Sequence, residues 1–284
     1  MNSECALPAG AVLAEGPVWH EEHLYWVDIE RGELHRWHPA SGARRHWIVP
    51  GRVGFALPTQ RGDFMLGQND ALVRMDLNSG TRTAFATPTG EPAGNRFNDA
   101  KCDAAGRLWA GTMSAREEPG RGTLYRVEPS GELHAAVREV SISNGLAWSP
   151  DGRTLYYIDS PTRRVDAFDF DPASGAISGR RTVVTLTDGF PDGMCADAVG
   201  NLWIALWGGW AVACHDPRTG RRLAEVRVPV EAVTSCCFGD GDTLWITTAS
   251  RDLDATGRTQ QPLAGGLFRA NVGVGGPGPS LFRG

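Results

Sequence analysis

The sequence lacks the long hydrophobic runs that a membrane span or a secretory leader requires. No stretch approaches about 18 consecutive apolar residues, so no membrane-spanning helix is expected. The segment from Met1 to Gly10 has neither a basic start nor a long apolar run, and no secretory signal is predicted. We therefore expect a cytoplasmic protein that does not act at a membrane.

Cysteine pairs and clustered positive charge are also missing. The six cysteines show no CxxC spacing and no disulfide-dense frame, so we interpret them as free thiols in a reducing compartment. Adjacent Cys236 and Cys237 would point to opposite faces of a strand, which favours packing over redox chemistry. The 28 Lys and Arg residues against 33 Asp and Glu give a net charge of −5 without a basic block. Nucleic acid is therefore not an expected partner.

The common short catalytic motifs are absent as well. There is no GxSxG elbow, no P-loop and no HExxH pair. Gly273, Gly275 and Gly278 satisfy GxGxxG, but they lie in a proline-containing tail with no helical pattern after it. A dinucleotide site is therefore not expected, and the fold itself must indicate where the function lies.

A short strand-like pattern recurs six times and predicts that fold. Its copies are separated by 39 to 47 residues, and they begin at Leu24, Asp63, Leu108, Leu155, Leu202 and Leu244. This period matches a four-stranded propeller blade, and a turn rich in Gly, Asp, Asn or Pro precedes each copy. We predict an all-β protein with a single domain over residues 1–284. The domain is a six-bladed β-propeller of four-stranded blades around a central channel, which the first strand of each blade lines.

Four residues with side-chain oxygen share one offset from these repeats. Glu15, Asn98, Asn144 and Asp192 precede the repeated strand of their blades by 9 to 11 residues. Equivalent blades would place them in one ring at one mouth of the channel, where a cation is the simplest way to satisfy them. Turn chemistry is the alternative, because three of the four lie beside Gly or Pro.

Glu15, Asn144 and Asp192 are the predicted metal ligands. An all-oxygen set suits a hard ion such as Ca²⁺, Mg²⁺ or Mn²⁺. Three protein ligands leave positions for water and substrate, as in a catalytic site. Arg96 lies two residues before Asn98 and would share its face on a strand, where a guanidinium can bind substrate oxygens. A surface salt bridge is the alternative for Arg96.

The segments that carry these residues resemble the regucalcin (senescence marker protein)/gluconolactonase family, whose members are six-bladed propellers. The similarity runs over nearly the whole chain. Its most specific elements are NRFNDAKCDAAGRLWAGTM from Asn95 and PDGMCADAVGNLW from Pro191, and EGPVW from Glu15 and SNGLAWS from Ser143 accompany them.

The resemblance implies roles for the same positions that the offset selects. It implies a metal held by Glu15, Asn144 and Asp192. It also implies substrate contacts at Arg96 and Asn98, and a proton-transfer role for Asp192. Ca²⁺ is the first choice of ion, with Zn²⁺, Mn²⁺, Mg²⁺ and Fe²⁺ as alternatives.

Two further segments bear on the substrate. In the family a glutamate after the GTM element helps to hold substrate, and here both Glu117 and Glu118 are candidates, because the segment is shorter than in animal regucalcins. The LWGGW run, Leu206 to Trp210, resembles bacterial sugar-acid lactonases. Its aromatic rings would either form the floor of a sugar pocket or pack in the core.

The predicted function is metal-dependent hydrolysis of a sugar lactone, a gluconolactone-like aldonolactone, to the aldonic acid. Such an enzyme is a carboxylic ester hydrolase. The metal would polarise the lactone carbonyl, Asp192 would orient or deprotonate the attacking water, and Arg96 and Asn98 would bind sugar hydroxyls.

Two other functions stay open at this point. One is a non-catalytic calcium-binding or regulatory propeller of the regucalcin type. The other is a protein-interaction platform, which would require a large exposed apolar patch that the sequence does not indicate. The expected partner is a small-molecule sugar lactone, without an obligate protein partner.

Overall fold

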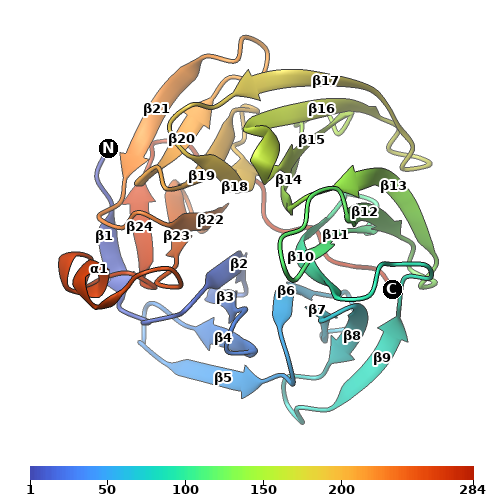
Figure 1. Cartoon of the computed structure of the whole chain (residues 1–284), viewed down its shortest axis with the longest axis horizontal. Coiled ribbons are helices and arrows are strands. Elements are labelled where there is room, and N and C mark those ends of the chain that lie inside the picture. The colour runs from blue at the N-terminus through green and yellow to red at the C-terminus, as the bar shows by residue number, and fades with distance from the viewer.

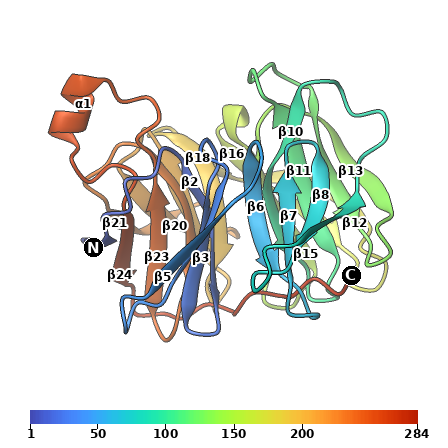
Figure 2. The ribbon, with the colours of Figure 1, turned by 90° about the horizontal axis from the view of Figure 1, so that it is seen from below.

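Six antiparallel sheets of four strands each surround a central channel in the computed structural model, which describes residues 1–284 (Figure 1). Seen from the side, the strands run between the two faces of a disc (Figure 2). Each sheet is one blade, and the innermost strands of neighbouring blades contact one another around the channel. The six-bladed β-propeller predicted from the repeats is confirmed.

In blades 1 to 3 the four strands are consecutive in the chain, and the first is the innermost. Blade 1 comprises β2 (Ala14–His20), β3 (His23–Asp28), β4 (Glu33–Trp37) and β5 (Arg44–Ile48). Blade 2 comprises β6 (Val53–Pro58), β7 (Phe64–Gln68), β8 (Ala71–Met75) and β9 (Arg82–Ala86). Blade 3 comprises β10 (Asn95–Cys102), β11 (Leu108–Ser114), β12 (Gly122–Val127) and β13 (Leu133–Val140).

Blades 4 and 5 follow the same rule, and blade 6 departs from it. Blade 4 comprises β14 (Ser143–Trp148), β15 (Thr154–Asp159), β16 (Arg164–Phe170) and β17 (Ile177–Thr185). Blade 5 comprises β18 (Phe190–Ala196), β19 (Leu202–Trp207), β20 (Ala211–His215) and β21 (Arg222–Arg227). Blade 6 comprises β22 (Val233–Phe238), β23 (Thr243–Thr248), β24 (Leu267–Asn271) and, from the other end of the chain, β1 (Glu4–Leu7).

The repeated pattern forms the second strand of each blade, and in two blades the preceding turn holds its tryptophan. Asp103 and Asp197 each accept hydrogen bonds from N–H groups of their own turn. Each also accepts one from an indole Nε1, of Trp109 and Trp203 respectively, at 3.1 Å. Because a buried indole N–H needs an acceptor, this contact explains the shared pattern D-A-x-G-x-L-W.

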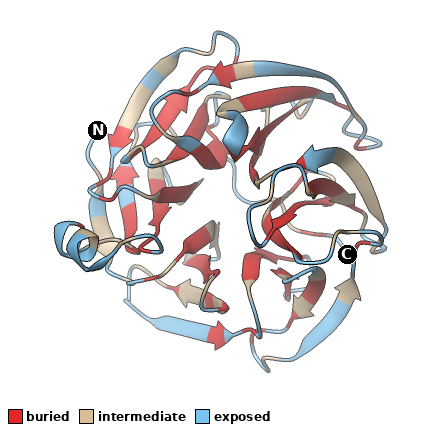
Figure 3. Ribbon diagram, in the orientation of Figure 1, coloured by how far each residue is buried: buried red, intermediate tan, exposed pale blue.

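The hydrophobic core is divided among the interfaces between blades, because the channel occupies the centre. The largest cluster has 15 buried residues and joins blades 5 and 6. Figure 3 shows that the inner strands are buried, whereas much of the outer strands is exposed. Cys236 belongs to this cluster and Cys237 packs against another, so the adjacent cysteines face opposite sides as predicted. All six cysteines are free thiols.

Both ends of the chain fasten the ring, a feature that the repeats do not predict. Strand β1 pairs with β24, so the N-terminus completes the last blade. The C-terminal tail crosses the face opposite α1 (Figure 2). The carbonyl of Gly275 accepts from the N–H of Ala198 in blade 5, and the N–H of Phe282 donates to Pro58 in blade 2. The Phe282 side chain is fully buried and meets Phe85 edge to face at 5.6 Å.

Helices are short and few. A 3₁₀ helix spans Ser160–Thr162, and α1 spans Ala255–Gln260. The carboxylate of Asp254 accepts a hydrogen bond from the N–H of Gly257 and so caps α1. No helix is long and apolar enough to cross a membrane.

The buried tail residue provides a test of this closure. Phe282→Ala is expected to lower the free energy of unfolding by about 3–5 kcal/mol, because it leaves a cavity where a fully buried ring was. Urea denaturation measures the change. Ile48→Ala is the control, since Ile48 is 71% exposed, and it should stay within about 0.5 kcal/mol of the wild type. Equal stability of the two variants would contradict a fastening role for the tail.

Candidate functional site

The four residues predicted to form a ring line one cavity at one mouth of the channel. Glu15, Asn98, Asn144 and Asp192 lie in the first halves of β2, β10, β14 and β18, and all four border the same space of ≈ 270 Å³. Arg96 borders it too. The shared sequence offset therefore corresponds to a shared height in the channel.

Every innermost strand has an irregularity in its pairing at this height. The shifts in register lie between Glu15 and Val18, Val53 and Ala56, Phe97 and Ala100, Asn144 and Leu146, Pro191 and Met194, and Val233 and Ser235. A β-bulge bends its strand and changes where side chains point. The candidate ligands therefore lie on bulged strands, and the turn interpretation of these residues is wrong.

A glycine follows each of the three predicted ligands, and two of these glycines let neighbouring blades approach closely. A Cβ on Gly145 would lie 2.8 Å from the carbonyl oxygen of Asp192. A Cβ on Gly193 would lie 2.0 Å from Oγ of Ser235. The glycines of the SNG and PDG segments are therefore required by packing between blades, which brings Asn144 and Asp192 into one ring.

A chain of hydrogen bonds fixes the amides of the ring. Nη1 of Arg96 donates to Oδ1 of Asn98 at 2.6 Å, and Nδ2 of Asn98 donates to Oδ1 of Asn144 at 3.0 Å. Nδ2 of Asn144 donates to Oγ of Ser160 at 2.8 Å, and that hydroxyl donates to the carbonyl of Pro191 at 2.6 Å. The chain joins blades 3, 4 and 5, so the orientation of the Asn144 amide is set from both sides.

Glu15 and Asp192 are buried carboxylates with fewer hydrogen-bond donors than buried carboxylates usually have. Oε2 of Glu15 accepts only from the N–H of Gly16, at 2.8 Å, and no group donates to the carboxylate of Asp192. Burial and the charge of Asp99 raise the pKa of Glu15 to about 8. Burial, followed by the charges of Glu15 and Asp99, raises the pKa of Asp192 well above its ordinary value. In the absence of a cation, the cavity therefore disfavours ionisation of both carboxyl groups.

This donor set fits a divalent cation. Two carboxylates and the Oδ1 atom of Asn144 are oxygen donors of the kind that hard cations prefer. A positive ion among them would offset the burial and repulsion that raise both pKa values. Oδ1 of Asn144 accepts one hydrogen bond and keeps a second lone pair for a ligand bond.

Arg96 is a buried guanidinium without an acidic partner. Its side chain donates only to Oδ1 of Asn98 and the carbonyl of Phe97, it forms no ion pair, and its Nε has no partner. Burial, with a smaller contribution from Arg52, lowers the pKa of Arg96 to about 10, so the group stays charged at neutral pH. The salt-bridge interpretation of Arg96 is wrong, and its unused N–H groups can serve a bound molecule.

The two candidate glutamates after the GTM element point to different places. Glu117 lines the cavity and accepts a hydrogen bond from Nη2 of Arg251 at 2.6 Å. Glu118 does not line it, and accepts instead from Ser114 Oγ and from Nη1 of Arg121 at 2.7 Å.

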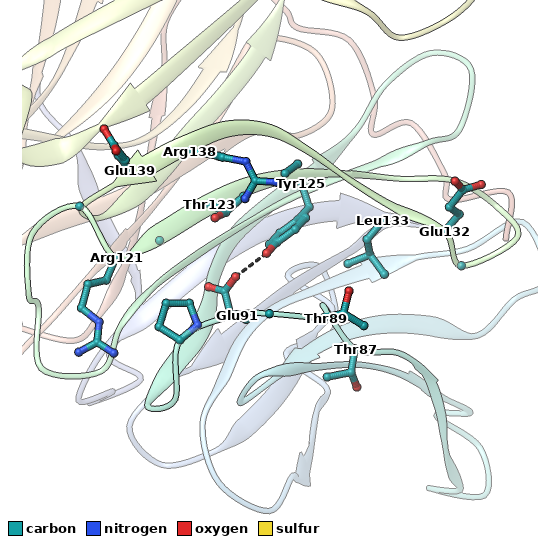
Figure 4. A pocket seen from close by; sticks show the side chains of 16 residues that line it. Thr87, Thr89, Glu91, Arg121, Thr123, Tyr125, Glu132, Leu133, Arg138 and Glu139 are labelled. Atoms are coloured by element: carbon teal, nitrogen blue, oxygen red, sulfur yellow. Dashed lines mark hydrogen bonds between the residues drawn. The ribbon is translucent and has the colours of Figure 1, made fainter.

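Arg121 borders a separate polar hollow of ≈ 630 Å³ beside the outer strands of blade 3 (Figure 4). There the carboxylate of Glu91 accepts hydrogen bonds from the hydroxyls of Tyr125 and Thr112, and from Nδ2 of Asn95 at 2.6 Å. Glu91 therefore ties the β9–β10 loop to blade 3. This hollow is distinct from the channel mouth.

Several cavity residues were missed by the sequence reasoning. Their common feature is that they follow the repeated second strand of a blade, so a search at that position would have found them; they are Ile29, Ser160 and Arg251. Asp99 directly follows Asn98, and its charge raises the pKa of both Glu15 and Asp192. The residues of the LWGGW run lie in different environments. Trp207 lines the cavity, Leu206 is buried in the core and Trp210 is exposed.

The fold and the cavity together define a six-bladed propeller with a carboxylate- and amide-lined site at one mouth of its channel. The family described as the SMP-30/gluconolactonase/LRE-like region matches residues 13–250. The chain belongs to this family.

Close relatives span almost the whole chain. Regucalcin of Oryctolagus cuniculus is 38% identical over 293 residues, covering 99% of this chain and 98% of the relative. A Bacillus subtilis protein provisionally named sugar lactone lactonase YvrE is 39% identical over 280 residues, covering 96% of each chain. The solved structure of a calcium-binding protein, regucalcin, from Agrobacterium tumefaciens superposes with a TM-score of 0.94 at 29% identity, covering 100% of this chain and 97% of that one.

The raised pKa of Glu15 predicts how stability depends on pH in protein treated with a chelator. Between its ordinary value of 4.5 and about 8, folded Glu15 keeps a proton that the unfolded chain releases. The folded state then binds more protons, so the free energy of unfolding falls as pH rises, by up to about 1.4 kcal/mol per pH unit. Melting temperatures at pH 5 and pH 8 measure the effect.

Glu15→Gln removes the titrating group and should flatten this dependence. The variant is near-isosteric, so the difference between the two pH profiles reports the titration of Glu15 together with the effect of its charge on Asp192. Identical profiles for wild type and variant would contradict an uncompensated, buried carboxylate at this position.

Proposed function

We propose that the protein hydrolyses a sugar lactone, an aldonolactone of the gluconolactone kind, to the aldonic acid, with a divalent cation held by Glu15, Asn144 and Asp192. The observation that carries the proposal is the pair of buried carboxylates Glu15 and Asp192, which together accept one hydrogen bond, beside a buried guanidinium without an acidic partner. Such a set is costly unless a cation and a polar substrate complete it.

The proposed roles divide the cavity into two parts. A bound cation would polarise the lactone carbonyl, and Ca²⁺ is the first choice for an all-oxygen set, with Zn²⁺, Mn²⁺, Mg²⁺ and Fe²⁺ as alternatives. Arg96 and Asn98 donate to oxygens of the lactone and fix its position. Glu117 accepts from a sugar hydroxyl, and Phe190 and Trp207 supply an apolar wall.

Asp192 serves as the proton acceptor of the reaction. The oxygen of a water molecule adds to the lactone carbonyl carbon, and its proton passes to the Asp192 carboxylate. The bond between that carbon and the ring oxygen then breaks, and the proton is returned to the ring oxygen as it becomes a hydroxyl. The product is the open-chain aldonic acid.

The names of relatives support this class of substrate, and one of them supports a competing function. The Bacillus subtilis relative carries the name of a sugar lactone lactonase, whereas the Agrobacterium relative is described as a calcium-binding protein. A non-catalytic calcium-binding role would need the ring carboxylates only. It would not account for the orphaned Arg96 or for a cavity of ≈ 270 Å³, which exceeds the room one ion needs. These two features favour the enzyme.

The proposed setting is the cytoplasm, with a small-molecule lactone as the partner. No obligate protein partner, nucleic acid or membrane contact is part of the proposal.

Metal removal is the first test of the proposed reaction. Chelated protein should remain folded, because the core lies between the blades and away from the ring, yet it should lose lactone hydrolysis, and Ca²⁺ should restore it. Acid release from gluconolactone in a pH-stat measures turnover. Asp151→Ala is a suitable control, since Asp151 lies in the exposed β14–β15 turn. Full turnover by exhaustively chelated protein would refute metal dependence.

A second test concerns the proton acceptor. Asp192→Asn keeps the size and one oxygen of the side chain but lacks the basicity of a carboxylate. With saturating Ca²⁺ we expect kcat to fall by about 100-fold or more, the usual size of a general-base contribution. Steady-state kinetics at saturating Ca²⁺ gives the answer, and a kcat near that of the wild type would remove Asp192 from the proton transfer.

A further inference from the structure

An ion pair spans the mouth of the cavity from opposite sides of the propeller. Glu117 belongs to the β11–β12 connection of blade 3, and Arg251 follows β23 of blade 6. Blades 3 and 6 lie across the channel from each other (Figure 1). Nη2 of Arg251 nevertheless donates to Oε1 of Glu117 at 2.6 Å, and both residues line the cavity.

The loop that carries Arg251 is anchored to the segment that leads into β2 of blade 1. The N–H of Ser250 donates to the carbonyl of Val12, and Oγ of Ser250 donates to the carbonyl of Ala11 at 2.8 Å. Ser250 itself is buried. Arg251 therefore extends from a backbone segment that the hydrogen bonds of Ser250 fix in place.

Glu117, in contrast, has an unfavourable backbone conformation. Its φ is +59°, in the left-handed region that residues other than glycine rarely adopt. Its N–H donates to the carbonyl of Ser114, which closes a tight turn after β11. A strained residue beside a ligand cavity is a mark of function, provided that surrounding contacts hold it there. Arg251 supplies such a contact.

Stability does not account for this pair. The side chains of Arg251 and Glu117 are 34% and 43% exposed, and ion pairs so open to solvent contribute little to folding. Their position is the notable property, because the pair places a carboxylate oxygen over the cavity. Arg96 lines the same cavity, and its pKa is lowered by the charge of Arg251 and raised by the charge of Glu117.

We propose that Arg251 is a positioning residue that holds the Glu117 carboxylate over the cavity, so that its free oxygen accepts a hydrogen bond from a substrate hydroxyl. The inference rests on the proposed lactone hydrolysis, including its Glu117 contact, and adds the residue that fixes this contact from the opposite side of the mouth. A lactone with no hydroxyl within hydrogen-bond distance of Glu117 would bind with the same affinity whether or not Arg251 holds Glu117 in place. Arg251 acts on substrate affinity through Glu117 and takes no part in the chemical step.

The test is a double-mutant cycle with Arg251→Ala and Glu117→Gln, assayed on gluconolactone with saturating Ca²⁺. Arg251→Ala should raise KM by about tenfold, as expected for one charge-assisted hydrogen bond, with kcat nearly unchanged. The double variant should be no worse than Glu117→Gln alone, because Arg251 acts through that residue. Arg251→Lys should recover part of the loss.

Two readouts separate this role from a structural one. Melting temperature and Ca²⁺ affinity by calorimetry should both stay unchanged in Arg251→Ala. Arg181→Ala is the matched control, since Arg181 pairs with Asp169 on the outer strands of blade 4, and its KM should equal that of the wild type.

Three results would overturn the inference. They are an unchanged KM in Arg251→Ala, a KM effect that adds in full to that of Glu117→Gln, and a KM effect explained by lost Ca²⁺ binding. A wild-type protein that hydrolyses no sugar lactone would refute the proposed function itself, and the inference with it.

Discussion

The placement of Glu15 and Asp192 in one buried cavity is the constraint on which the rest of the site depends. Two ionised carboxylates with only one hydrogen-bond donor between them would repel each other, and burial adds to the cost of ionising them. The bulges of the innermost strands and the close approach at Gly145 and Gly193 bring them together all the same. A cation would make this arrangement favourable, because it would replace repulsion by attraction.

The propeller is well suited to build such a site. Six blades of similar construction present equivalent positions to one axis, so residues distant in the chain converge without long loops. The core lies between blades and leaves the channel free for polar groups. The hydrogen-bond chain from Arg96 to Pro191 then ties three blades to one another at the height of the carboxylates.

Much of the fold and the ring could be predicted from the sequence, because both depend on a period. The repeats indicate six blades, and a similar offset from them, 9 to 11 residues, indicates Glu15, Asn98, Asn144 and Asp192. Contacts that do not recur with the blade repeat could not be predicted from the sequence. The pairing of β1 with β24 and the docking of Phe282 join ends of the chain that share no pattern. Sequence alone also left Glu117 and Glu118 as equal candidates, and only the turn after β11 separates them.

The central claim, that the ring binds a divalent cation, is tested most directly by anomalous diffraction from crystals soaked in Mn²⁺. The account predicts one strong anomalous peak in the channel, bonded to carboxylate oxygens of Glu15 and Asp192 and to Oδ1 of Asn144. Crystals of Glu15→Gln treated in the same way should show a weaker peak or none. A peak bonded to other residues, or an empty ring in the wild type at saturating Mn²⁺, would contradict the account.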